Sequence, residues 1–326
     1  MASFMNKIAE KYICMSSSVN VYRNLKDFKF KNSLSLEDEK SIYNTVCSSF
    51  YKLPYSDRFN FERLDSKDKV IENFKKGAIY PDDTVYTENS YIGIRDDFLC
   101  FFKINAKEHI EIIGTIPGVN FFRSSHFAYE IESDLEEELK FSFNTKLGYL
   151  FEDISLVGNG LKLRAVLHLP AINSFNLIDF VKKKMKLKNI KFYNLKKFDI
   201  CSDFYFMEYT ANNEEEFSLI RQMDKFVFEI VDLEIENRRK LFETKLDYYK
   251  EKYERYKMIL NSKKDIDINV VTTFISLCFL LQSLSLAIDC EFKFLYDCFM
   301  NARSSCFLDE KEKKLYEISN SLMEVV

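Results

Sequence analysis

The sequence predicts an α+β protein, in which a mainly antiparallel sheet flanked by helices is followed by an all-helical C-terminal region. Three observations support this prediction. Residues 84–117 hold short β-type runs joined by turns too short for a helical crossover, which indicates an antiparallel meander. Residues 213–238 place apolar side chains three and four apart, as a helix packed on one face does. Beyond Leu241 the pattern is helical throughout.

Local signals place the strands and helices in order along the chain. Ser35 has the character of a helix N-cap, because acidic residues follow it in the first turn. Ser133 and Glu136 have the spacing of a capping box, so a helix is expected to begin there. The predicted strands are 13–23, Tyr91–Ile94, Leu99–Ile104, Ile110–Gly114, Leu161–Leu169, Ile190–Phe198 and Phe204–Thr210. The predicted helices are 35–53, 67–76, Ser133–Phe143, Asn173–Lys186, Asn213–Arg238, 243–261, 269–289, 291–302 and 309–325.

Composition indicates a globular protein whose partners are chosen by a local site. With 326 residues and 47% apolar side chains the chain can bury a sizeable core, and we expect two domains, 1–238 and 239–326. A formal charge of −4 argues against a nucleic-acid or anionic-membrane binder. The basic run 182–191 is interpreted as a solvated helix end; the alternative is a nucleic-acid patch with Phe192 and Tyr193 as stacking platforms.

The cysteines and histidines show no metal-binding pattern. Eight cysteines contain no CxxC pair and there are three histidines, so we expect no metal site and reduced, mostly buried thiols. No secretory signal pattern is visible, and we expect a cytoplasmic protein. The uncharged run 268–288 is long enough to span a membrane, but polar residues such as Asn269 and Gln282 favour a buried helix.

The stretch Lys146–Ile172 is the part of the sequence most typical of a functional site. It holds three of the seven glycines and one of the four prolines, so a turn-rich loop, Ser155–Gly160, leads into a strand. The strand Leu161–Leu169 alternates as a half-buried strand does.

This stretch resembles the phosphagen (guanidino) kinase superfamily, most closely its bacterial protein-arginine kinase branch. The family pattern is GYLT-x-CPTN-x-GTGLRASV, two further residues and HLPAL. The residues that match it without a gap are Gly148, Tyr149, Leu150, Gly158, Gly160, Leu161, His168, Leu169, Pro170 and Ala171. Asp153 stands where the family has its reactive Cys, and Lys162 where it has a phosphate-binding Arg.

The resemblance extends to two earlier segments. In 16–24, Ser18 and Asn20 stand where the family places arginines against ATP phosphates, and only the outer Arg23 remains. The acidic signature NEEDHLRI falls on 105–112 with three identities, Asn105, His109 and Ile112. There Lys107 replaces the carboxylate that positions the guanidinium, and Glu111 replaces a phosphate-binding Arg.

Two further segments resemble the family in a looser register. AIYPDD resembles the family's HLISPEL segment, with Gly77 at the His. Lys191 stands at a further Arg and Lys196 at the substrate-gripping Glu. The resemblance implies a catalytic-type α/β domain and a helical dimerisation domain, hence a homodimer, with Mg-ATP as cofactor if the family activity survives.

We predict that this chain is a catalytically inactive pseudokinase with a binding or regulatory role. Phosphoryl transfer depends on positioning and on neutralising phosphate charge. The five arginine positions are occupied by two neutral residues, one carboxylate and two lysines, which lack the bidentate fork of Arg: Ser18, Asn20, Glu111, Lys162 and Lys191.

Two alternatives stay open. The first is an active phosphotransferase on protein arginine or another guanidino substrate. Its phosphate ligands would be Lys107, Lys162, Lys191 and Lys196, and Asp153 or Glu152 would serve the guanidinium. The second is a structural or adaptor protein whose helical region pairs with itself or with a protein partner. Tyrosines between 248 and 256 suit an interface, although a core stripe is the simpler interpretation.

Overall fold

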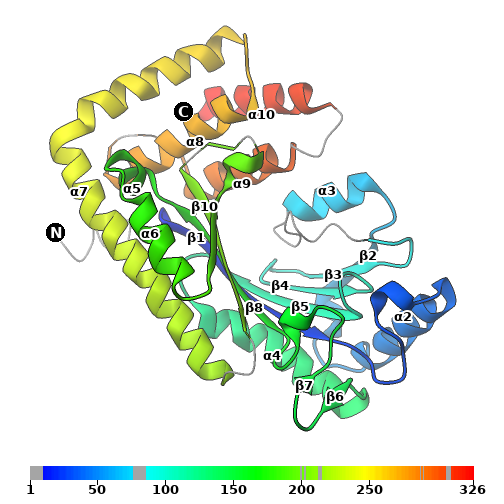
Figure 1. The fold of residues 1–326 in the computed structure, drawn as a ribbon. Helices are drawn as coiled ribbons and strands as arrows, with labels where there is room; N and C mark the ends of the chain where they lie inside the picture. Colours follow the sequence, from blue (N-terminus) through cyan, green and yellow to red (C-terminus); the bar gives the residue numbers. More distant parts are fainter. Residues whose placement is uncertain are drawn as a thin grey trace. The chain divides into compact units, whose positions relative to one another are not determined.

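The computed structural model describes residues 10–75, 86–198, 200–201, 203–211, 215–286, 288, 290–305 and 310–326. The segment that contains Gly77 lies outside these residues. The part that is described contains an eight-stranded sheet with helices and an all-helical C-terminal region, as predicted (Figure 1).

The strand order is β2-β3-β4-β5-β1-β8-β10-β9, and the pairs β2–β3, β3–β4, β4–β5 and β5–β1 are antiparallel. The strands are β1 Cys14–Arg23, β2 Phe59–Arg63, β3 Tyr91–Arg95, β4 Cys100–Ile104, β5 Ile110–Ile116, β8 Leu161–His168, β9 Lys191–Asn194 and β10 Phe204–Ala211. A separate two-stranded sheet pairs β6 Phe143–Asn144 with β7 Gly148–Tyr149. The predicted meander of three strands is therefore confirmed as β3, β4 and β5.

The helices are α2 Leu36–Phe50, α3 Lys67–Lys75, α4 Phe121–Glu138, α5 Pro170–Ser174, α6 Ile178–Lys186, α7 Glu216–Ser262, α8 Ile268–Ser283, α9 Phe292–Ser305 and α10 Lys311–Val325. Short 3-10 helices are η1 Lys31–Ser33, η2 Ser56–Arg58, η3 Ile154–Leu156 and η4 Leu195–Phe198. Ser35 caps α2 as predicted, in a capping box with Asp38. None of the helices among the described residues is long and apolar enough to cross a membrane.

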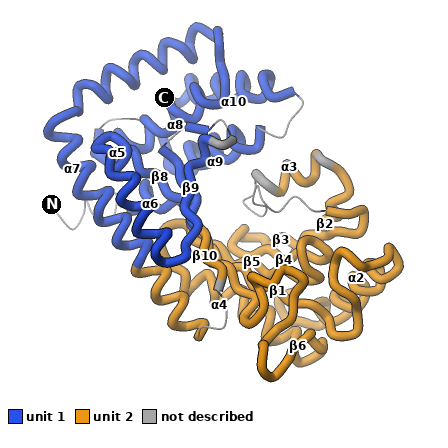
Figure 2. The backbone as a smooth tube through the Cα atoms, in the orientation of Figure 1, with its two compact units in different colours: residues 1–15, 165–207, 226–326 blue, residues 16–164, 208–225 orange. Residues whose placement is uncertain are grey.

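The chain divides into two compact units (Figure 2). Unit 1 comprises 1–15, 165–207 and 226–326, and unit 2 comprises 16–164 and 208–225. The division at residue 238 stays a prediction; the 47-residue helix α7 runs through that position.

In unit 2, α4 packs on one face of the sheet. A Cβ atom on Gly114 would lie 1.8 Å from the backbone oxygen of Ser124 in α4, so only glycine permits this approach. The Ser124 hydroxyl also donates to Ser17 O over 3.0 Å. Phe102, whose neighbour on β5 is Ile112, lies on this face and stacks on Phe50 of α2. The opposite face of these strands carries the polar residues described below.

In unit 1, the retained His168 and the residues after it have structural contacts. The buried His168 side chain lies 2.9 Å from Ser276 Oγ of α8, and Arg238 of α7 donates to His168 O over 3.1 Å. The Glu234 carboxylate accepts bonds from the backbone N–H groups of Ala171 and Ile172, which satisfies the start of α5. This part of the family motif therefore joins a strand end to two helices.

The predicted helix start at Ser133 is wrong. Ser133 lies inside α4, whose N-cap is Asn120, and the Asn120 side chain accepts from Arg123 N. The Asn120 signal outweighs the apparent capping box, because a Ser-x-x-Glu spacing also occurs by chance within an acidic helix. Residues 139–143 lie beyond the end of α4.

Two predicted helices of the C-terminal half are one. The segments 213–238 and 243–261 join in α7, because the residues between them include no glycine or proline to end the helix. Conversely, the predicted helix 173–186 is interrupted between α5 and α6, where Asn176 has φ +56°. The predicted helix 269–289 ends at Ser283, and Ser285 has φ +58°.

Two predicted strands also differ from the structure. All eight residues of β8 are buried, so the strand is covered on both faces and does not alternate. A central strand covered on both faces has no solvent-facing side chains, and its polar residues must find partners inside the protein. The predicted strand 190–198 becomes β9 followed by η4.

Gly160, at the start of β8, is expected to tolerate no side chain. It has φ +61°, and an added Cβ would lie 2.4 Å from Phe151 and 2.7 Å from Tyr22 O. Gly160→Ala should therefore lower the free energy of unfolding by about 2–5 kcal/mol, from left-handed strain plus overpacking. Gly118→Ala is the matched control, because Gly118 has φ +81° with no atom within 4 Å of the added Cβ. Gly118→Ala should lower the free energy of unfolding by about 1–2 kcal/mol, and urea titration of both variants measures the difference. Equal losses of stability at the two positions would contradict the packing argument.

Candidate functional site

The face of the sheet opposite α4 carries the positions that the resemblance assigns to phosphate-binding arginines. Ser18, Asn20 and Tyr22 alternate along β1, and β5 places Glu111 directly opposite Tyr22. Ser18, Asn20 and Glu111 are all buried. Unit 2 thus brings three of the predicted positions onto one face of neighbouring strands.

Glu111 is held by two partners on this face. The β4–β5 register places Lys103 opposite Glu111, and the two side chains form an ion pair of 2.9 Å. Asn20 Nδ2 donates to the other carboxylate oxygen over 2.8 Å. The Lys103 and Glu111 side chains are 0% and 1% exposed, so both charges are fully buried.

Lys103 changes the interpretation of Glu111. The sequence marks Glu111 as a reversed charge, whereas the structure shows a carboxylate already neutralised by a lysine. Lys103 was not singled out from the sequence, although the signal was present. Pairing the ends of the two predicted strands, Ile104 and Ile110, places residue 103 opposite residue 111, and opposite charges on facing positions of neighbouring strands attract.

Lys107 and Asp153 form a second ion pair. Lys107 lies in the β4–β5 turn and its Nζ is 2.6 Å from Asp153 Oδ2, with both side chains partly exposed. Burial alone would raise the pKa of Asp153, but hydrogen bonds from Lys107 and Ser155 outweigh it and hold the pKa well below its usual range. The positions that the resemblance assigns to a guanidinium-binding carboxylate and a reactive Cys are therefore bonded to each other.

The third group of charges lies on β8 and β10. Arg164 Nε donates to Glu208 Oε2 over 2.8 Å, and both side chains are buried. Lys162, two residues earlier on β8, is 4% exposed and its Nζ lies 5.5 Å from the centroid of the Tyr22 ring. Burial, together with the neighbouring Arg164, lowers the pKa of Lys162 to about 8.

Arg23, the arginine of the first motif that remains, has structural partners. Its Nε donates to Glu132 of α4 over 2.7 Å, and one terminal nitrogen donates to Tyr22 O and Asn159 O. The guanidinium also lies 3.5 Å from the centroid of the Tyr149 ring. Arg23 thus ties β1 to α4 and to the glycine loop.

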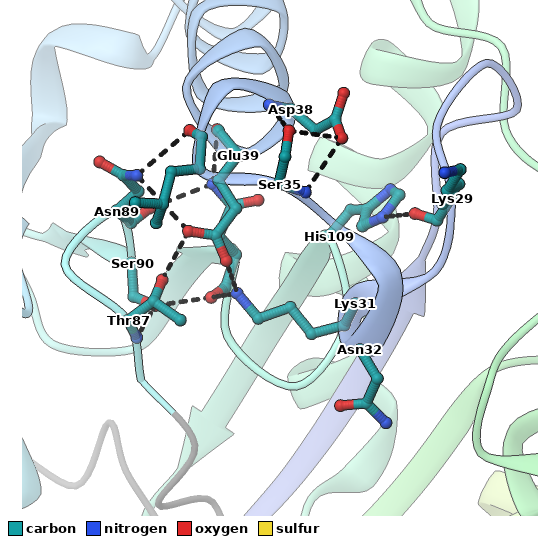
Figure 3. A network of polar contacts seen from close by, with 12 residues as sticks. Lys29, Lys31, Asn32, Ser35, Asp38, Glu39, Thr87, Asn89, Ser90 and His109 are labelled. Carbon is teal, nitrogen blue, oxygen red and sulfur yellow. Dashed lines mark hydrogen bonds and ion pairs between the residues drawn. The ribbon is translucent and has the colours of Figure 1, made fainter.

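Asn105 and His109, the identical polar residues of the acidic signature, hold the β4–β5 turn in place. Figure 3 shows His109 bonded to Lys29 and, nearby, the contact between Lys31 and Glu39. Asn105 has φ +56°, and its Nδ2 donates to Glu39 O and Asn89 O. Its own carbonyl accepts from Ser90 Oγ and from Lys31 Nζ, which pairs with Glu39 over 2.6 Å. The left-handed turn conformation suits asparagine, and the network provides partners for the buried Nδ2 and carbonyl oxygen of Asn105.

The His109 ring is neutral, and its two hydrogen bonds show which ring nitrogen carries the hydrogen. Leu25 N–H donates to its Nδ1 over 3.0 Å, so Nε2 carries the hydrogen and donates to Lys29 O over 2.8 Å. Burial lowers the pKa of His109 to about 4. Next to it, Glu108 accepts from Asn24 Nδ2 over 2.7 Å, and burial raises the pKa of Glu108 to about 7.

Lys191 and Lys196 belong to unit 1. Both side chains are exposed, Lys191 at the start of β9 and Lys196 in η4. The Lys196 backbone N–H donates to the Asn194 side chain over 2.6 Å. Glu152, which the sequence offered as an alternative ligand for a guanidinium, accepts two hydrogen bonds from Asn32.

The residues on the sheet face do not fit a nucleotide triphosphate. Phosphate oxygens need cationic or N–H donors. Two of the buried charges on this face are carboxylates, Glu111 and Glu208, and each is paired with one cation of the same face. Within the described ranges no group of His, Cys, Asp or Glu side chains could hold a metal ion.

The Lys103–Glu111 pair is expected to show strong coupling in unfolding experiments. Lys103→Met alone and Glu111→Gln alone should each lower the free energy of unfolding by about 3–5 kcal/mol, because each leaves a buried charge unpaired. The double variant should lose far less than the sum, since no charge is left. The exposed pair Arg58–Asp96 is the control, where Arg58→Met and Asp96→Asn should each lower the free energy of unfolding by less than about 1 kcal/mol. Additive losses for Lys103 and Glu111 would contradict the ion pair.

Comparison with known proteins identifies a family and relatives. Residues 41–197 match the family model described as ATP:guanido phosphotransferase, C-terminal catalytic domain. The protein-arginine kinase of Clostridium perfringens (strain 13) is 27% identical over 189 residues, which are 55% of this chain and 53% of that protein. The protein-arginine kinase of Syntrophomonas wolfei is 31% identical over 167 residues, 49% of this chain and 46% of that protein. The chain thus spans about half the length of the curated relatives it matches.

Solved structures show the same fold at lower identity. The duplicated taurocyamine kinase of Schistosoma mansoni with bound transition state analog components has a TM-score of 0.61 at 17% identity, covering 71% of this chain and 34% of that chain. A lombricine kinase has a TM-score of 0.56 at 14% identity, covering 69% and 66% of the two chains. The family-model match and the protein-arginine kinase relatives, together with the retained glycine and His-Leu-Pro motifs, lead to one conclusion: the chain belongs to the ATP:guanido phosphotransferase family.

Proposed function

We propose that this chain is a catalytically inactive member of its family, a pseudokinase that acts as a binding or regulatory module. One observation carries the proposal: Glu111, at a position of a phosphate-binding Arg, is buried and bonded to Lys103 and Asn20. A triphosphate at this face would meet two buried carboxylates. At close range and an effective dielectric of about 20, a carboxylate without a partner would repel a phosphate charge by about 4 kcal/mol. Pairing with Lys103 and Arg164 weakens this repulsion, but the same pairing leaves these two cations with little attraction for a phosphate.

The contacts of the substrate-side positions support the same proposal. An arginine substrate needs a carboxylate that is available for its guanidinium. Here Lys107 occupies the carboxylate position, and Asp153 is bonded to it over 2.6 Å. The active alternative, in which Asp153 or Glu152 serves the guanidinium, would require these bonds to Lys107 and Asn32 to break first.

The proposal predicts no phosphoryl transfer and no nucleotide binding. Incubating the protein with Mg-ATP and an arginine-rich protein should yield no phosphoarginine by phosphorus NMR. Millimolar Mg-ATP should leave the melting temperature unchanged, because a ligand that binds the folded state raises it. The protein-arginine kinase of Clostridium perfringens would be the positive control for the assay. Phosphoarginine formation, or a clear ATP-dependent rise in melting temperature, would refute the proposal.

A repaired variant provides the matched test of the site map. Ser18→Arg, Asn20→Arg, Glu111→Arg and Lys162→Arg restore four of the five family arginines, and Lys103→Met removes the cation that Glu111 neutralised. This five-residue variant should gain stabilisation by Mg-ATP. The same four arginines with Lys103 kept should be strongly destabilised, because two buried cations would then face each other.

We also propose that the chain forms a homodimer through its C-terminal helices or presents them to a protein partner. Helix α8 does not provide a surface for this association, because thirteen of its 16 residues are buried. Exposed apolar side chains lie instead on α7, namely Tyr248 at 56% and Met258 at 65%. The described cysteines are free thiols, which suits the cytoplasmic location that we propose.

Light scattering tests the association. The purified protein should have the mass of a dimer at micromolar concentration, and Tyr248→Glu with Met258→Glu should shift it toward the monomer. Lys146→Glu, a change on an exposed residue of unit 2, is the control and should leave the mass unchanged. A parent protein that is monomeric at all concentrations would exclude the homodimer and leave the partner role, which a pull-down with the same variants examines.

A further inference from the structure

Helix α6, which Figure 2 shows in unit 1, exposes two large apolar side chains on one face. Phe180 is 61% exposed and Leu187 is 84% exposed. They stand seven residues apart, and Leu187 keeps helical backbone angles at the C-cap, so both side chains lie on the same side of the helix. The opposite side holds the buried Val181 and Met185. The apolar pair therefore faces away from the core of unit 1.

Lysines surround this apolar pair. The basic run 182–191 holds six lysines and no carboxylate, so the formal charge of −4 for the whole chain does not describe this surface. Lys183 lies between Phe180 and Leu187 on the helix face, and Lys186 flanks them; both lysines are exposed. The ion pairs that α6 makes within the described residues involve other lysines, namely Lys182 with Asp179 and Lys184 with Glu229. Lys183 and Lys186 thus keep their charges available for an anionic partner.

The aromatic rings that follow the helix argue against a nucleic acid as that partner. Phe192 stacks on Tyr205 of β10 with 5.1 Å between the ring centroids, and the Tyr193 ring lies 5.2 Å from that of Phe206. Single strands are bound by aromatic rings on which the bases stack. Here those rings pack on the sheet of the protein itself, and the most exposed apolar side chain of the patch is Leu187, which has no ring.

The residue types of the patch favour a lipid surface over a protein. Protein interfaces are depleted in lysine, and their apolar anchors fill matching pockets on the partner. A membrane interface accepts protruding apolar side chains without a matching shape, while lysine stems lie along it and keep their ammonium groups at the level of the headgroups. Anionic lipids attract such lysines. Both the exposed apolar pair and its lysines therefore complement an anionic membrane.

We propose that α6 docks on the surface of a membrane that contains anionic lipids. Phe180 and Leu187 enter the boundary between headgroups and acyl chains, and Lys183 and Lys186 contact the lipid phosphates. The helix lies along the surface, because its two apolar side chains are on one side. Since the lysines contribute through charge, high salt weakens the association.

Vesicle flotation measures this binding. The probes are vesicles of phosphatidylcholine alone and of an equimolar mixture of phosphatidylcholine and phosphatidylglycerol. The protein should bind the mixed vesicles at low salt and leave the neutral ones unbound. Phe180→Ser with Leu187→Ser should weaken binding about 100-fold, about tenfold for each apolar side chain removed. Lys183→Gln with Lys186→Gln should weaken it about 25-fold, about fivefold for each lysine.

A matched control removes two other exposed apolar side chains. Leu36 and Phe98 are 54% and 50% exposed, but acidic residues adjoin each of them in the sequence. Leu36→Ser with Phe98→Ser should leave vesicle binding unchanged. Equal weakening by this control and by the α6 serine variant would overturn the proposal, because the loss would then not depend on the patch.

A tryptophan placed in the patch reports insertion directly. The chain contains no tryptophan, so Phe180→Trp provides a single emitter that keeps the apolar character of the position. Its emission should shift to the blue on the mixed vesicles, and lipids brominated on the acyl chains should quench it. Phe98→Trp should show neither change. The proposal is overturned if the Phe180→Trp emission does not respond to the mixed vesicles. It is also overturned if a single-stranded oligonucleotide binds, and the glutamine variant weakens that binding, while vesicles do not bind.

Discussion

The buried ion pair between Lys103 and Glu111 determines the chemistry of the sheet face in unit 2. A charge in the interior is costly unless an opposite charge and hydrogen bonds accompany it. The antiparallel register of β4 and β5 supplies the cation, and Asn20 on β1 supplies the hydrogen bond. Three neighbouring strands are thus linked by one carboxylate, at a position that the family pattern gives to an arginine. Any ligand for this face must compete with that pair.

The family residues that this chain keeps are the ones that hold the backbone. Gly160 leaves room for Phe151 and Tyr22, and His168 connects the end of β8 to α7 and α8. Asn105 and His109 support the β4–β5 turn through backbone groups. None of these contacts needs a substrate. Retention of the frame is therefore explained by folding alone, and it carries no evidence for catalysis.

The sequence was sufficient for the fold class and for β1, β3, β4 and β5 of unit 2, because turns and alternation there are local signals, but it did not predict β2. It misplaced the start of α4, where an acidic helix interior imitated a capping box, and it divided α7 at a point with no helix-ending residue. The partners of the site residues were harder to predict. Lys103 could be paired with Glu111 from the hairpin register, but the Lys107–Asp153 bond joins residues 46 apart in sequence and depends on the tertiary fold.

The charges that depart from the family pattern are matched in pairs rather than scattered. Glu111 has Lys103, and Lys107 has Asp153, each at ion-pair distance. Independent loss of catalytic residues would leave buried charges without partners, and each such charge would cost several kcal/mol of stability. The pairing indicates that this face is stable as an electrostatic structure of its own.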